Sequence, residues 1–322
     1  MTKEIELWQF ITSRLKEGGA VRLLVVAASS GSSPGRAGYK MAVTAKGHLF
    51  GSIGGGVMEV GLVEQAKVKS KKAKGKLLCE IIEQVHRKNA PNASGMICSG
   101  RQTVILRLLT PDDMPTVGSI IQAIENDASA SITITQNSFE VGPTKVGAQN
   151  TTFERQTEAE FEYNEKIGFK NRLYIIGGGH CAFALSELMS RMNFYISIYD
   201  DRPELNTIDK NRFAHEIAII ESYETIGQFV DSGPDEYVVV MTLGYKSDEQ
   251  VIRALFDKDL KYFGVLGSKA KMKTLLTTLE KEGYAKERLS LIHTPIGLPI
   301  KSRTPEEIAV SIAAEIISIK NS

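Results

Sequence analysis

Apolar residues follow two different spacings along the chain, and the change between them divides it into halves. In residues 1–18, Ile5, Trp8, Ile11 and Leu15 lie three to four positions apart, which is typical of an amphipathic helix rather than a secretory leader. The rest of the first half mixes short apolar runs, helical segments and glycine-rich turns, so we expect a mixed α/β domain. The expected strands are 21–28, 41–44, 48–53, 77–84 and 102–109, the expected helices run from the glycines at 54–56 to about 74 and from 117 to 126, and a weak β region ends near 153.

The second half alternates short buried strands with helices in a regular order. This alternation predicts a parallel sheet with helices on both faces. We therefore expect a Rossmann-like doubly wound domain over 171–322, an N-terminal mixed α/β domain over 1–153, and a charged, glutamate-rich linker at 154–170. The expected strands of the second half are 173–176, 195–199, 216–220, 237–242 and 262–266.

The first strand of this half runs into a G-x-G-x-x-A turn, the pattern of a dinucleotide-binding βαβ unit. In that pattern Gly177 permits the tight turn, Gly179 lets a pyrophosphate approach the backbone, and Ala182 permits close packing of helix on strand. Asp200 ends the next strand, where an acidic side chain binds a ribose hydroxyl. His180 lies inside the turn, and it either meets a phosphate or caps the helix.

A second glycine-rich junction lies in the first half, where a strand leads through Gly54, Gly55 and Gly56 into a helix. Free amides at a helix N-terminus bind anions, so these glycines and Ser52 are candidates for holding a phosphate. The alternative is a tight turn that needs positive φ angles. Glu59 lies in the first turn of the helix, where it is a further candidate or simply complements the helix dipole.

Three more loops carry candidate chemistry. Arg36 lies in the Gly-, Ser- and Pro-rich segment 29–38, which either folds over the glycine junction and supplies charge or is an exposed loop. Cys98 precedes a strand and is either an accessible thiol or a small buried hydrophobe. Gly267 and Ser268 follow the last strand of the second half, at the edge where open α/β sheets bind ligands.

Two helix starts in the second half have recognisable signals. Asp248 follows the fourth strand and is either a polar contact for a ligand or a helix N-cap. Thr304, Pro305 and Glu307 have the spacing of a capping box with proline at the first helical position. The last helix is therefore expected to begin at Pro305.

Composition narrows the classes of function. The 322 residues suffice for two domains, and a net charge of +1 gives no reason to expect nucleic acid; the lysine-rich run 67–76 is expected at a helix end. Cys79, Cys98 and Cys181 lack CxxC spacing, which argues against a disulfide scaffold or a structural zinc site and favours a reducing cytosol. No apolar run approaches the roughly 20 residues of a membrane span. No hydrolase or metalloprotease pattern is present.

Taken together, these motifs resemble the XdhC/CoxI family of accessory proteins for molybdenum hydroxylases such as xanthine dehydrogenase. The resemblance follows the chain in order through both halves, which makes it more specific than either glycine turn alone. Its segments in this sequence are 35–41, 51–59 and 98–100 in the first half and 176–180, 200–203, 264–269, 295–300 and 304–315 in the second.

The resemblance implies a cytoplasmic cofactor chaperone of purine catabolism without turnover of its own. Such a protein binds molybdenum cofactor, as molybdopterin or its cytosine dinucleotide, and shelters it while a cysteine desulfurase-type sulfurtransferase replaces an oxo ligand by sulfido. It then delivers the cofactor to an apo-hydroxylase, and Cys98 is the residue expected to approach the metal. The cofactor-binding residues implied in this way are Arg36, Ser52, Gly54, Gly55, Gly56, Glu59, Cys98, Gly177, Gly179, His180, Asp200, Gly267 and Ser268.

Two positions depart from the pattern of many family members. Val57 stands where many have Cys, and Leu243 stands where many have His after the fourth strand. Any thiol contact with the cofactor would therefore depend on Cys98. The alternative function is an NAD(P)-dependent oxidoreductase that uses the Rossmann turn and Asp200. A homodimer is a further expectation, because two-domain proteins of this kind often bury a strand edge or helix face by pairing.

Overall fold

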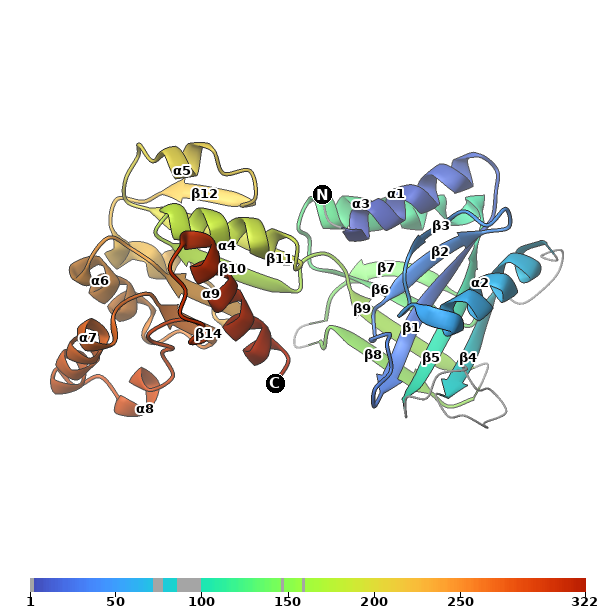
Figure 1. Ribbon diagram of the computed structural model, residues 1–322. Helices are drawn as coiled ribbons and strands as arrows, with labels where there is room; N and C mark the ends of the chain where they lie inside the picture. Colours follow the sequence, from blue (N-terminus) through green and yellow to red (C-terminus); the bar gives the residue numbers. More distant parts are fainter. Residues whose placement is uncertain (1–2, 72–77, 86–99, 146–147, 158–159) are drawn as a thin grey trace. The chain divides into compact units, whose positions relative to one another are not determined.

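Residue contacts divide the chain into two compact α/β units, Met1–Gly168 and Phe169–Ser322 (Figure 1). The structure is a computed structural model that describes residues 3–71, 78–85, 100–145, 148–157 and 160–322. No helix among these residues is long and apolar enough to cross a membrane.

Unit 1 contains two antiparallel sheets. The larger has the order β3-β2-β1-β5-β4 and the smaller β7-β6-β9-β8. The strands expected in the first half are confirmed, and the weak β region resolves into the smaller sheet. The strands are β1 Val21–Ser30, β2 Lys40–Thr44, β3 Leu49–Gly51, β4 Cys79–Val85, β5 Arg101–Leu109, β6 Ala130–Thr135, β7 Phe139–Pro143, β8 Thr151–Arg155 and β9 Phe161–Lys166.

Two cores hold unit 1 together, one on each face of the larger sheet. Alternate residues of β1 point to opposite faces, so Leu23 and Val25 join one core and Leu24 and Val26 the other. The first core also takes residues from α1, α3 and the smaller sheet, and the second is covered by α2. The helices are α1 Lys3–Lys16, α2 Gly56–Lys71, the 3-10 turn η1 Pro111–Asp113 and α3 Met114–Glu125.

The segment 154–170 is not the linker that its charge suggested. It contributes to β8 and β9, and the contact boundary falls after Gly168. In β9 the inward positions Phe161, Tyr163 and Glu165 are buried and alternate with more exposed polar residues. The charged residues at the outward positions gave this segment the composition of a linker, although its buried residues recur with the period of two that is typical of a strand.

Unit 2 is a doubly wound parallel sheet of order β12-β11-β10-β13-β14, as expected. Helices α4 and α9 cover one face, and η2, α6 and α7 cover the other (Figure 1). The strands are β10 Asn171–Ile176, β11 Phe194–Asp200, β12 Glu216–Ile219, β13 Gly233–Val240 and β14 Leu260–Val265. The helices are α4 His180–Ser190, α5 Asn206–Asp209, η2 Tyr223–Gln228, α6 Tyr245–Leu255, α7 Lys269–Lys281, α8 Lys286–Leu289 and α9 Pro305–Lys320.

Helix α9 begins where the capping box predicts. The Thr304 hydroxyl accepts a hydrogen bond from the Glu307 amide, and the Glu307 carboxylate accepts one from the Thr304 amide.

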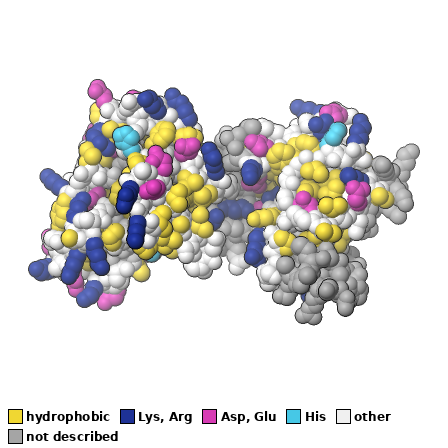
Figure 2. Space-filling model, viewed as in Figure 1, with side chains coloured by type: hydrophobic (Ala, Val, Ile, Leu, Met, Phe, Trp, Pro, Cys, Tyr) yellow, Lys and Arg dark blue, Asp and Glu magenta, His cyan; other side chains and the backbone are white. Residues whose placement is uncertain are grey.

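Figure 2 shows hydrophobic side chains gathered on the face of unit 2 where α9 lies. The exposed apolar residues of this region are Leu298, Ile300, Val310 and Ile317.

Candidate functional site

Two loops of unit 1 that carry candidate residues meet beside the start of β5. A Cβ atom at Gly35 would overlap the Ile53 carbonyl, and one at Gly54 would lie 2.5 Å from the Gly35 amide nitrogen. A Cβ atom at Gly100 would lie 2.5 Å from the Ser33 nitrogen. The glycines therefore let segments 31–38 and 52–56 and the start of β5 pack backbone against backbone.

Gln102 ties two of these loops together. Its side-chain oxygen accepts a hydrogen bond from the Ser33 hydroxyl at 2.9 Å, and its side-chain nitrogen donates to the Ile53 carbonyl at 3.0 Å. The side chain is fully buried, so both of these bonds are shielded from water. No motif in the sequence indicates Gln102; the available signal is a polar amide within the apolar run that forms β5.

Donors of the glycine junction in unit 1 are bound by a side chain of α2, the helix that follows it. One Glu59 carboxylate oxygen accepts hydrogen bonds from the Ser52 hydroxyl at 2.7 Å, the Ile53 amide at 2.9 Å and the Gly55 amide at 3.0 Å. Gly54, Gly55 and Gly56 have φ angles of 126°, 76° and 74°, so the turn does require glycine. The amides predicted to hold a phosphate thus already hold a carboxylate.

The charges of segment 29–40 have different surroundings. Arg36 is exposed and donates a long hydrogen bond of 3.3 Å to the Gly31 carbonyl. The Lys40 side chain is only 8% exposed, and its ammonium lies 2.7 Å from the Glu165 carboxylate and 3.7 Å from that of Glu4. Burial alone would lower the pKa of Lys40, but the two carboxylates outweigh it and raise that pKa. Arg36 is therefore the cation of this loop that a ligand can reach.

The thiols in the described part of the chain do not form a metal site. Burial raises the pKa of Cys79 to about 11 and raises that of Cys181 as well, so both thiols are neutral near pH 7. The described residues contain no group of three or more His, Cys, Asp or Glu side chains able to hold a metal. Cys98, the predicted metal contact, lies outside the described residues.

In unit 2 the three consecutive glycines have three different surroundings. Gly177 has a φ of 105°, and a Cβ atom there would overlap the Met241 carbonyl. A Cβ atom at Gly178 would meet the Ile208 side chain at 2.6 Å, whereas one at Gly179 would meet nothing within 4 Å. Gly179, the position predicted to admit a ligand, is therefore the one that faces open space.

Asp200 is buried at the end of β11, and the protein itself binds both of its carboxylate oxygens. One accepts from the Gly178 amide at 2.6 Å and from Arg202 Nη2 at 2.7 Å; the other accepts from the amide and Nε of Arg202 at 2.9 and 2.8 Å. Burial opposes ionisation, but these hydrogen bonds outweigh it and lower the pKa of Asp200. A ribose hydroxyl would have to share this carboxylate with Arg202.

The remaining predicted residues of unit 2 lie at helix starts. His180 is the first residue of α4 and is exposed. Ser268 is the N-cap of α7, where its hydroxyl accepts a hydrogen bond from the Lys271 amide at 3.3 Å. A Cβ atom at Gly267 would crowd the sulfur of Met272 at 2.8 Å, so this glycine serves close packing.

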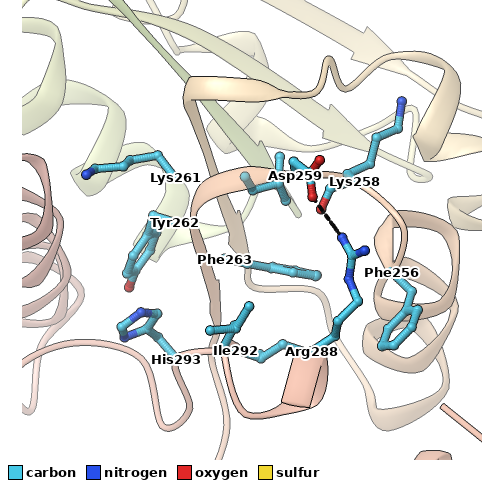
Figure 3. Close-up of a pocket in the computed structure, with 11 residues that line it drawn as sticks. Phe256, Lys258, Asp259, Lys261, Tyr262, Phe263, Arg288, Ile292 and His293 are labelled. Carbon is cyan, nitrogen blue, oxygen red and sulfur yellow. Dashed lines mark hydrogen bonds and ion pairs between the residues drawn. The ribbon is translucent and has the colours of Figure 1, made fainter. Parts of the chain in front are cut away.

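A separate cavity of about 230 Å³ lies beside the beginning of β14 (Figure 3). Arg288 reaches across it to Asp259 at 3.1 Å, and the rings of Tyr262 and His293 stack at 4.9 Å. None of the predicted site residues lines this cavity.

The fold and the two glycine junctions define a class: a two-unit α/β protein whose second unit is of the Rossmann type. Residues 173–316 match the XdhC Rossmann domain, and residues 14–77 match the XdhC and CoxI family. Together these matches take in more than half of the chain. The chain therefore belongs to the XdhC and CoxI family, as its motifs indicated.

Two relatives and one solved structure are similar to this chain. The chain is 30% identical over 156 residues to the protein YqeB of Escherichia coli and 32% identical over 156 residues to a probable xanthine dehydrogenase subunit of Bacillus subtilis. Each match covers 48% of this chain, but only 28% and 45% of those relatives. A crystal structure described as a xanthine dehydrogenase from Bacillus halodurans has the same fold, with a TM-score of 0.71, 22% identity and coverage of 100% of this chain and 96% of that one.

Proposed function

We propose that this protein is an accessory factor of a xanthine dehydrogenase-type molybdenum hydroxylase, and that it binds molybdenum cofactor before delivery to the enzyme. The observation that carries the proposal is the meeting of two family segments of unit 1, around Gly35 and Gly54, with Gly100 packed against the loop that precedes Gly35. The family match and the name of the Bacillus subtilis relative support the choice of client.

The residues of this meeting point suit an anionic cargo in part. Arg36 is an exposed cation beside the glycine junction, and Ser52 and Gly55 supply donors. Those donors now bind Glu59, so a phosphate of the cargo either displaces this carboxylate or binds through Arg36 alone. Sulfuration by a cysteine desulfurase-type partner and the choice between molybdopterin and its cytosine dinucleotide belong to the same proposal.

Copurification tests this function directly. The full chain is purified from cells that make molybdenum cofactor, and bound pterin and molybdenum are assayed. We expect both to copurify, and we expect Arg36→Met to lower the bound pterin several-fold. Lys46→Met is the matched control, because Lys46 is exposed in the turn between β2 and β3 and lies outside the two family segments. Absence of pterin and molybdenum, with none taken up on addition, would contradict the proposal.

An NAD(P)-dependent oxidoreductase is the second candidate, and the open space at Gly179 favours it. The bonding of Asp200 to Arg202 weighs against it, because the ribose-binding carboxylate is already occupied. Saturable binding of NADH, followed by its fluorescence and abolished by Asp200→Ala, would support this candidate. Binding of pterin without binding of NADH would reject it.

A further inference from the structure

The carboxyl edge of the unit 2 sheet holds a polar triad, Thr242, Asp248 and Lys271, of which the sequence indicated only Asp248 as a candidate ligand contact. The Thr242 hydroxyl donates to one Asp248 carboxylate oxygen at 2.6 Å, and the Lys271 ammonium lies 2.8 Å from the other. Asp248 is 1% exposed. It is not the N-cap of α6, which is Gly244, so its role is to hold these two partners.

The triad lies beside the glycine turn. Strands β10 and β13 are neighbours in the sheet, and the connections from them lead to opposite faces, which makes this the topological switch point where open α/β sheets bind ligands. A Cβ atom at Gly177 would lie 2.9 Å from the Thr242 amide nitrogen. Thr242 thus links the turn after β10 to Asp248 and, through it, to Lys271.

The charge at this edge favours an anion. Helices α4, α6 and α7 all begin here, and the N-terminus of each carries partial positive charge. The side chain of Lys271 is 32% exposed, whereas that of its carboxylate partner is 1% exposed. An ammonium has three donors, so Lys271 can bind Asp248 on its buried side and a ligand on its exposed side.

We propose that Lys271 is an anion-binding residue of unit 2, oriented by Asp248 and Thr242, and that it binds a phosphate group of a ligand held at the glycine turn. The group that this site would recognise is a diphosphate, which either free diphosphate or a nucleoside diphosphate supplies. This proposal goes beyond the proposed function, because it concerns the Rossmann unit and does not depend on cofactor delivery.

Calorimetric titration of the full chain at low ionic strength tests the proposal, with inorganic pyrophosphate and ADP as separate probes. We expect Lys271→Met to weaken binding about 10- to 100-fold, the value of one hydrogen bond to a charged group. Lys271→Arg keeps the charge and is expected to retain most of the affinity. Lys273→Met removes the same charge from an exposed position of the same helix and is expected to change nothing. A preference for ADP would identify the nucleotide as the source of the diphosphate.

A variant that keeps the cation separates positioning from folding. Asp248→Asn leaves Lys271 charged but removes its anchor, so affinity is expected to fall while the protein stays folded. The double variant D248N/K271M carries no unpaired buried charge and should fold, yet it should bind the probes weakly. Three results would overturn the proposal. They are an affinity of Lys271→Met within twofold of the wild type, an equal loss of affinity in Lys273→Met, and no binding of either probe by the wild type at millimolar concentration. Lys271→Met and the wild type should copurify the same amount of pterin. Failure of the anion-binding proposal can therefore be distinguished from failure of the proposed function.

Discussion

The two strand–glycine–helix junctions look alike in sequence, but their amides are used differently. At the unit 1 junction, Glu59 from the following helix accepts hydrogen bonds from Ile53 and Gly55. At the unit 2 junction, the Gly178 amide donates to Asp200 from the next strand, and Gly179 faces open space. The first junction is closed by a residue four to six positions away, whereas the second is closed only in part.

This difference shows that a glycine motif specifies a backbone shape before it specifies a ligand. Both turns need glycine for positive φ or close packing. Whether the turn also binds an anion depends on which carboxylate is within reach of its amides. In unit 1 this carboxylate belongs to Glu59 in the helix that follows the turn, whereas in unit 2 it belongs to Asp200 at the end of β11. The free energy needed for a ligand to displace the carboxylate therefore differs between the two turns.

The largest expected effect separates the two roles of glycine within the unit 2 turn. Gly177→Ala adds a Cβ atom at a φ of 105° and against the Met241 carbonyl, so we expect a loss of about 3–6 kcal/mol in the free energy of unfolding. Gly179→Ala has space for its Cβ and an ordinary φ of −71°, so a change below about 1 kcal/mol is expected. Urea unfolding followed by far-UV circular dichroism measures both. Equal losses would show that the turn is uniformly constrained.

The ion pair beneath the unit 1 loops is expected to have the next largest effect. Lys40→Met leaves the buried Glu165 carboxylate without this cation, and Glu165→Gln leaves Lys40 with only the more distant Glu4, so each change is expected to cost about 3–5 kcal/mol. The double variant K40M/E165Q should recover much of this loss. Trp8, the one tryptophan, is buried in unit 1, so its fluorescence reports the unfolding of this unit. Single losses below about 1 kcal/mol would show that the pair does not hold the loop.

The same pair predicts how the stability of unit 1 changes with pH. The pKa of Lys40 is raised in the folded state, so its stabilisation is complete below the unfolded value of about 10.4 and is lost as pH rises through the higher folded value. Unit 1 of the wild type should therefore lose stability at alkaline pH more steeply than K40M/E165Q does. Parallel pH profiles of Trp8-monitored unfolding would contradict this assignment.

The fold of unit 2 was predictable because each of its signals is local. Buried strands alternate with helices, and the glycine turn and the capping box at Thr304 mark helix starts within a few residues of sequence. The β9 strand was not predictable in the same way, because its outward charges gave it the composition of a linker. Glu165, a charged residue at an inward position, binds the Tyr163 hydroxyl on its own strand and Lys40, which lies 125 positions away.

The candidate site was predictable in its residues but not in their bonding. The sequence identified Glu59 and Asp200 as acidic residues near glycine turns, and both do contact those turns. It did not indicate that Arg202 binds Asp200 through two nitrogens of its guanidinium, or that Lys271 reaches Asp248 on a different helix. Such pairings depend on side-chain direction in the folded chain, which spacing alone does not fix.

Removal of Glu59 tests whether the unit 1 junction accepts an external anion. Glu59→Ala leaves the Ile53 and Gly55 amides without their acceptor, and we expect a loss of about 1–3 kcal/mol. Added sulfate should restore more stability to this variant than to the wild type, because the vacated amides can bind it. Glu64→Ala, on the exposed face of the same helix, is the matched control. An equal response to sulfate in all three proteins would show that the turn does not bind anions.

The smallest expected effect concerns the carboxylate that closes the unit 2 junction. Arg202→Met removes two hydrogen bonds from a partly exposed side chain, and we expect a loss of about 1–2 kcal/mol near neutral pH. The pKa of Asp200 is lowered in the wild type, so its stabilisation is present above the unfolded value of about 3.9 and is lost as pH falls through the lower folded value. Without Arg202, burial of Asp200 remains while its strongest partner is gone, so the acid loss should begin at higher pH. Urea unfolding between pH 3 and 7 measures the shift. An unchanged acid limb in Arg202→Met would mean that the backbone amides of residues 178 and 202 keep Asp200 ionised without the guanidinium, in which case the ribose-binding position is open to a ligand after all.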